Sequence, residues 1–297
     1  MAATSDETNM MIDTLRTSLR TDFPEIDSHY SDEYLASVLN VPNRTFEYAR
    51  DEKIRGALQW RREYDVDVLC DAFYHVVQAD NEDGADGIFR PTMNSVISDK
   101  KEEDCQDDSN TKKRLFTPSQ SLIDVCQSRA FVFGGYDHDG RAILFARTAY
   151  LDWWKTGVQD GLRYHVLVIE HVLRMIRESN NTEKGGRVED RRRNEEDNPT
   201  ENKKGLLREV TPESFVLYVD TSNLSFIPPP LGALTGMCKL LQRAYPDRVH
   251  KIYIGPVNAV LMNLQKYVSP YLRPRSRDKI CLLEVIPDRD NIVVRGG

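Results

Sequence analysis

The alternation of apolar and polar positions divides the chain into three blocks that can each bury side chains. In the first block, residues 9–75, apolar residues recur at helical spacings and the capping residue Ser31 precedes the apolar run 34–39, which predicts an N-terminal helical region. The second block, residues 119–178, begins with a short helix, continues with two apolar runs around a glycine-rich turn, and ends with a helical stripe of apolar residues. It therefore predicts a β-hairpin between two helices.

The third block, residues 206–290, alternates short apolar runs typical of buried strands with longer amphipathic runs typical of helices. Strands are expected at 215–219, 251–254 and 279–283, and helices at 231–245 and 257–268. Repeats of this kind imply right-handed crossovers and parallel pairing of the strands. The fold class is therefore α/β, with a mixed, mostly parallel sheet of about five strands, and residues 119–290 are expected to form one domain.

Two stretches between these blocks are too polar to build a core. Residues 79–114 contain long runs of acidic and other polar residues, and residues 179–205 are a mixture of acids and bases with almost no large apolar side chains. Such segments bury too little apolar surface to offset the entropy of ordering the chain. Both are predicted to be disordered insertions in surface loops.

Composition narrows the class of protein. Of the 297 residues 40% are apolar, and no apolar run approaches the roughly 20 residues that a membrane-spanning helix needs. The first residues lack the apolar segment of a secretory signal, and the five cysteines form no CxxC pair. These features favour a cytoplasmic protein without disulfides or a zinc site.

The familiar catalytic motifs do not occur in the sequence. It contains no GxSxG elbow, no P-loop, no GxGxxG and no HExxH, and the six histidines have no metal-ligand spacing. The motifs therefore indicate no catalytic residues and no metal ligands, and a Cys-His or Ser-His-Asp site assembled from distant residues stays open.

Charge is distributed unevenly along the chain. The net charge is −7, but residues 231–280 contain nine Lys or Arg against two acids, so this segment carries +7 and the remainder −14. A local basic block on an acidic protein indicates either an ordinary solvated surface or a face that contacts an anionic ligand or surface. We expect no nucleic-acid partner.

The predicted helix 257–268 combines a wide apolar face with basic residues directly after it, at Arg273, Arg275 and Arg277. One interpretation is a core-packing helix with a basic C-terminus. The other is a movable amphipathic lid, which closes over an apolar cavity and dips into an anionic membrane surface when it opens.

Several short motifs, in order and at matching spacings over about residues 30–290, resemble those of the CRAL-TRIO lipid-binding family. They are Trp60–Asp67, Tyr136–Ile143, Phe215–Asp220, Tyr245–Arg248, Lys251–Pro256, Val268–Leu272 and Asp278–Ile280. The resemblance implies a three-helix N-terminal region packed on an α/β lipid-binding domain, whose sheet forms the floor of the pocket. It also implies one bound hydrophobic molecule, such as a phospholipid, a tocopherol or a retinoid, and no catalytic centre.

The resemblance assigns residues to a gate and to a head-group site. The helix 257–268 corresponds to the gate of the family, and its apolar positions Val257, Val260, Leu261, Leu264 and Val268 are the expected gate and membrane contacts. In members that bind phosphatidylinositol, the matching head-group residues are Asp247, Arg248, Ser276 and Lys279. The alternative for Asp247 and Arg248 is an ion pair with each other. The basic cluster that the family carries in its second N-terminal helix is replaced by residues 40–43, with only Arg44 nearby.

The expected function is binding of a single lipid and its exchange at membranes, by a monomer that associates transiently and peripherally with an anionic membrane surface. Two other classes stay open. A regulatory or scaffold module would use the same fold and recruit partners through the polar insertions. An α/β enzyme would show a cluster of strongly perturbed titratable groups in a polar pocket.

Overall fold

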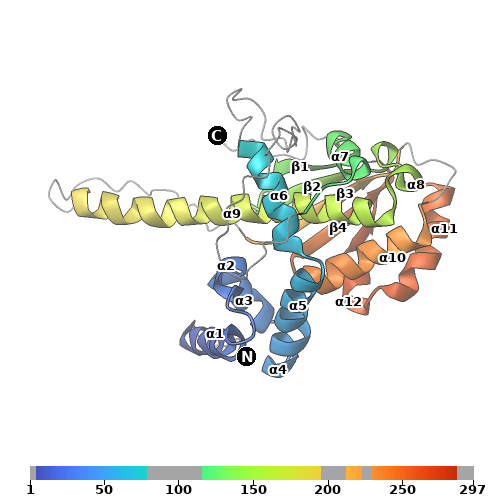
Figure 1. Ribbon diagram of the computed structural model, residues 1–297. Helices are drawn as coiled ribbons and strands as arrows, with labels where there is room; N and C mark the ends of the chain where they lie inside the picture. Colours follow the sequence, from blue (N-terminus) through green and yellow to red (C-terminus); the bar gives the residue numbers. More distant parts are fainter. Residues whose placement is uncertain (1–4, 79–115, 195–211, 223–228, 286–297) are drawn as a thin grey trace.

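The computed structural model describes residues 5–78, 116–194, 212–222 and 229–285 (Figure 1). A helical N-terminal region lies against one side of an α/β unit, and the long helix α9 (Val158–Asn194) runs between them. None of the helices in these ranges is both long enough and apolar enough to cross a bilayer.

The described strands form one five-stranded sheet in the order β1-β2-β3-β4-β5. Their bounds are β1 Phe131–Tyr136, β2 Ala142–Arg147, β3 Phe215–Asp220, β4 Val249–Gly255 and β5 Ile280–Leu282. The β1–β2 hairpin is antiparallel, whereas the pairs β2–β3, β3–β4 and β4–β5 are parallel. The predicted α/β class with a mixed, mostly parallel sheet is confirmed.

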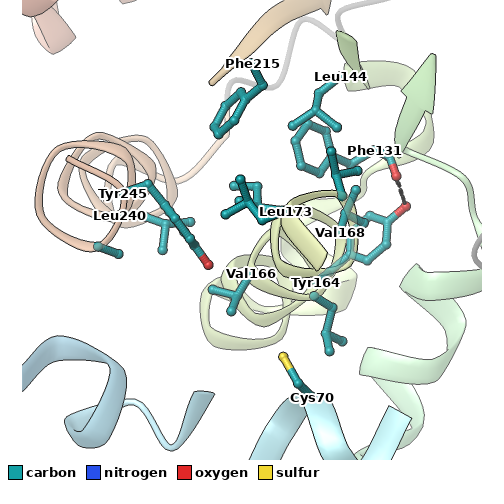
Figure 2. Packing of buried hydrophobic residues seen from close by; sticks show 14 of the residues in the cluster. Cys70, Phe131, Leu144, Tyr164, Val166, Val168, Leu173, Phe215, Leu240 and Tyr245 are labelled. Atoms are coloured by element: carbon teal, nitrogen blue, oxygen red, sulfur yellow. Dashed lines mark hydrogen bonds between the residues drawn. The ribbon is translucent and has the colours of Figure 1, made fainter. Parts of the chain in front are cut away.

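Helices on the α/β unit connect and cover the strands. They are α7 Gln120–Gln127, α8 Trp153–Thr156, α9, α10 Leu231–Lys239, α11 Ala259–Val268 and α12 Pro274–Arg277, with a π-helical turn Leu240–Ala244 after α10 and 3₁₀ turns at Thr148–Tyr150 and Ser269–Tyr271. Helix α9 carries the apolar stripe found in the sequence, and its Val168 and Leu173 lie near Leu144 and Phe215 of the sheet (Figure 2). The Tyr164 hydroxyl donates to the Phe131 carbonyl at 2.7 Å.

Helix α9 continues well beyond the point where the sequence predicts its end. The polar stretch 179–205 was expected to be a disordered loop, but its residues up to Asn194 remain helical and extend past the body of the molecule (Figure 1). Elongating a helix that packing has already nucleated costs little free energy for each added residue. The rest of this stretch, and all of 79–114, lie outside the described residues.

The N-terminal region is helical as predicted, but it is divided into more elements than a three-helix arrangement. They are α1 Ser5–Arg20, α2 Ile26–His29, α3 Asp32–Leu39, α4 Phe46–Tyr48, a π-helical segment Ala49–Arg55, α5 Gly56–Glu63 and α6 Val66–Gln78. Asn43 and Asp65 have positive φ angles of 61° and 50°, which reverse the chain between helices. Ser31 caps α3 by accepting from the backbone N–H of Tyr34 at 3.1 Å.

Candidate functional site

A cavity of about 430 Å³ lies over one face of the sheet. Alternate residues of each strand form its floor, because side chains two residues apart point to the same face of a sheet. The floor residues come from every strand of the described sheet: Phe131, Ala146, Leu217, Val219, Ile252, Ile254, Ile280 and Leu282. The register pairs Ala146 with Val219 and Val219 with Ile254, so these three form one apolar row. This volume is typical of a small-molecule site.

Helices α10 and α11 roof the cavity. Leu261, Leu264 and Val268 of α11 face it, at spacings that place them on one side of the helix. Residues Leu234, Met237, Cys238 and Leu241 line it from α10 and the π-helical turn after it. The roof and floor are therefore both apolar.

Two of the five predicted gate residues do not line this cavity. Helix α11 begins at Ala259 instead of Val257, because the Asn258 side chain caps it by accepting from the backbone N–H of Leu261 at 2.8 Å. Val257 is exposed, and its N–H donates to the Leu283 carbonyl at 3.0 Å. Val260 is half-buried and outside the lining. The inner face of the roof helix thus starts at Leu261.

Cationic side chains gather at the β5 end of the cavity. Arg44 and Lys53 reach it from the N-terminal region, and Arg273, Arg275 and Lys279 reach it from the segment around α12. Asp247 and Ser276, two of the predicted head-group residues, also line it. We call these seven residues the basic rim. It brings together Asp247, Ser276 and Lys279, which are three of the four predicted head-group residues.

The rim carries more positive charge than its carboxylate can balance. Arg44 donates to Asp247 at 2.7 Å, and Arg275 lies 4.0 Å from the same carboxylate. Burial disfavours the charge on Asp247, but the hydrogen bond and charge of Arg44 hold its pKa below the usual value. Burial, helped by the charges of Arg273 and Arg44 and opposed by that of Asp247, lowers the pKa of Lys53 to about 8. Burial also lowers the pKa of Lys279, whose Nζ donates to the Val249 carbonyl.

Arg248 does not line the cavity, which corrects its predicted place in the head-group site. Its guanidinium pairs with Glu213 at 2.6 Å and lies 3.9 Å from the centre of the Tyr34 ring, and both charged side chains are buried. The alternative ion pair between Asp247 and Arg248 does not form either, because Asp247 pairs with Arg44. Arg248 therefore joins the N-terminal region to the strand β4.

Two lining residues were not found by sequence reasoning. Lys53 shares a helix face with Ala49 and Ala57, both fully buried, so a lysine on an apolar stripe was the available signal. His165 was read as one of six ordinary histidines, yet it is 4% exposed and lines the cavity. The available signal was its position, three residues after Leu162 and four before Ile169 on the apolar stripe of α9.

A second, polar cavity of about 480 Å³ lies between the N-terminal helices and α9. Arg61 lies 2.5 Å from Glu170 and 2.6 Å from Asp67, and the Tyr245 hydroxyl donates to Glu170 at 2.9 Å. Despite burial, the charge of Arg61 holds the pKa of Glu170 below its usual value, so this carboxylate is a poor base at neutral pH. Within the described ranges no three His, Cys, Asp or Glu side chains gather as metal ligands would. The network therefore joins two parts of the fold.

The fold and the first cavity define the class: an α/β binding protein with an apolar, helix-roofed pocket. A family model described as the CRAL/TRIO domain matches residues 127–286. The chain belongs to the CRAL/TRIO family, a family of lipid-binding and lipid-transfer proteins that are generally not enzymes.

A solved structure titled "Crystal structure of Sfh5" shares this fold. It aligns with a TM-score of 0.52 at 12% sequence identity, over 95% of this chain and 82% of the Sfh5 chain. A comparison with curated proteins finds no match.

Proposed function

We propose that this protein binds one lipid with an anionic head group in the cavity and exchanges it at anionic membrane surfaces. The observation that carries the proposal is a single apolar cavity that spans the sheet from β1 to β5 and ends in the basic rim. The lipid tail lies along the sheet, and the head group lies among Lys53, Ser276 and Lys279. Phosphatidylinositol fits this chemistry, since Arg44 and Lys53 supply positive charge from the N-terminal region.

The apolar walls explain why exchange needs a membrane. Each methylene moved from water into such a pocket gains about 0.8 kcal/mol, so a long acyl chain is released to water extremely slowly. A bilayer offers an equally apolar environment, so transfer there avoids most of this cost. Helix α11 is the part of the roof that opens, because a short set of side chains, Leu261, Leu264, Gln265 and Val268, holds it over the cavity.

The surface around the roof is suited to contact a bilayer. Met262 and Tyr267 of α11 are exposed, and Trp154 of α8 and Leu231 at the start of α10 are exposed as well. Helices α8 and α11 lie at the same end of the molecule (Figure 1). Exposed apolar side chains beside cations such as Lys266 favour insertion into an anionic interface, with about 1 kcal/mol from each well-placed charge. We expect a cytoplasmic monomer that docks transiently by this surface.

The test is transfer of fluorescent phosphatidylinositol from donor to acceptor vesicles that contain phosphatidylserine. The proposal expects transfer that rises in proportion to protein concentration and slows when phosphatidylserine is replaced by phosphatidylcholine. A protein that binds the vesicles but moves no lipid would instead support a regulatory or scaffold module.

A further inference from the structure

His165 is fixed at the end of the cavity opposite the basic rim. Its ring lies 4.6 Å from the Phe131 ring and 5.7 Å from the Trp153 ring, between centroids, and it is nearly parallel to Trp153 at 9°. The side chain is 4% exposed and lines the cavity. The two neighbouring rings leave the imidazole little freedom to turn.

One nitrogen of His165 is satisfied and the other is not. Nδ1 lies 2.7 Å from the carbonyl oxygen of Gly161, one helical turn earlier, so Nδ1 carries the hydrogen and donates it. Nε2 is then a bare acceptor, and it has no hydrogen-bond partner among the described residues. Among the described residues, Nε2 is not one of the polar side-chain atoms that are both fully buried and without a partner, so it is accessible. His165 lines the cavity, and the accessible space beside it is therefore the cavity.

The protonation state supports the same role. Burial lowers the pKa of His165 to about 4, while the Gly161 carbonyl acts in the opposite direction. The imidazole is therefore neutral throughout the physiological range, and Nε2 accepts hydrogen bonds but does not pair with anions.

The two polar ends of the cavity lie on opposite edges of the sheet. His165 contacts the Phe131 ring of β1, whereas Lys279 directly precedes β5. Four strand spacings of about 4.8 Å separate these edges, which gives a span of roughly 19 Å. Between them the floor is apolar, as described above. A ligand that fills the cavity meets the basic rim at one end, and at the other it meets Nε2 of His165 on the side where Arg147 and Thr148 also line the cavity.

We propose that the ligand carries a hydroxyl group that reaches the β1 end of the cavity and donates a hydrogen bond to Nε2 of His165. The inference rests on the proposed lipid-binding function and specifies the ligand further. The hydroxyl can belong to a chain-hydroxylated lipid with an anionic head, or it can be the only polar group of a neutral lipid alcohol. An acceptor buried beside a purely hydrocarbon tail would lose its hydrogen bond with water and gain none.

The first test compares palmitate with ω-hydroxypalmitate, which differ only by the hydroxyl at the far end of the chain. We expect the wild-type protein to bind the hydroxylated probe as tightly as palmitate or more tightly. In His165→Phe, which keeps the stacked ring but lacks the acceptor, the hydroxylated probe should bind at least about tenfold more weakly than palmitate. His165→Gln, which keeps an acceptor, should lie between the two. An identical ratio of the two dissociation constants in wild type and His165→Phe would overturn the proposal.

A second measurement does not depend on a variant that folds. In protein labelled with ¹⁵N-histidine, ω-hydroxypalmitate should move the Nε2 resonance of His165 upfield, whereas palmitate should leave it in place. Palmityl alcohol supplied in phosphatidylcholine vesicles distinguishes the two sources: a shift with it points to a neutral lipid alcohol, and a shift with ω-hydroxypalmitate alone points to a hydroxylated chain. If both acids bind and no probe shifts Nε2, the hydroxyl proposal fails while lipid binding stands. If no probe binds at all, both fail.

Discussion

Arg44 donates a hydrogen bond to Asp247 at 2.7 Å, and this pair makes the N-terminal region part of the cavity wall. Arg44 also donates to the Val38 carbonyl at 2.8 Å, which ties its guanidinium to the end of α3. Tyr34 of the same helix donates to the Pro246 carbonyl at 2.6 Å. The basic rim is therefore built by two segments far apart in the sequence, and the proposed head-group site needs both.

A carboxylate on the inner face of α11 should block lipid uptake. Leu264→Asp places a charge against the apolar cavity, and burying it beside a lipid tail is costly. We expect at least about tenfold slower transfer of fluorescent lipid between vesicles. Asn263→Asp puts the same charge on the exposed side of the same helix and should change the rate less than about twofold. Equal effects of both variants would remove α11 from its role as the gate.

Loss of a rim cation should weaken the preference for anionic lipids. Lys279→Met removes one charge from the head-group end, which is expected to cost about ten- to a hundredfold in affinity for phosphatidylinositol and little for phosphatidylcholine. Lys239→Met is the matched control, because Lys239 is exposed and does not line the cavity. Competition for the pocket between the two lipids measures the preference. A preference unchanged in Lys279→Met would place the head group elsewhere.

Binding of an anionic lipid should weaken as the pH rises above about 8. The pKa of Lys53 is lowered to about 8 in the empty protein, so at higher pH this amine is neutral and must take up a proton when an anion binds. The affinity for phosphatidylinositol should then fall by up to about tenfold per pH unit, and that for phosphatidylcholine should stay level. Lys53→Arg keeps its charge and should flatten the profile. The same slope in wild type and Lys53→Arg would show that another group titrates.

Arg248 should act on stability and not on lipid binding. Arg248→Met leaves the buried Glu213 carboxylate without its partner, which is expected to lower the free energy of unfolding by about 3–5 kcal/mol in urea denaturation. Adding Glu213→Gln should restore part of that loss. The folded variant should still take up lipid with wild-type preference. If Arg248→Met were as stable as the wild type but no longer bound phosphatidylinositol, Arg248 would belong to the head-group site after all.

The sequence predicted the sheet and most of helix α11 because local pattern determines them. Strand β3 is a continuous apolar run, and the inner face of α11 follows from the helical spacing of Leu261, Leu264 and Val268. The exact start of α11 was two residues off, since it depends on whether Asn258 turns its side chain back to cap the helix.

The composition of the rim was harder to predict because it depends on contacts between distant segments. Arg248 and Asp247 are adjacent in sequence, yet one points to Glu213 and the other to Arg44, and no spacing rule reveals such a division. Lys53 reaches the rim only because the N-terminal region folds against the α/β unit. The end of α9 was missed for another reason, since a polar composition also suits a helix that packing has already started.

Native mass spectrometry of the whole protein, after incubation with mixed-lipid vesicles and removal of the vesicles, tests the central claim most directly. The account predicts a mass increase equal to one lipid per chain, with phosphatidylinositol retained over phosphatidylcholine. A folded protein that keeps its unliganded mass at every lipid concentration would contradict it.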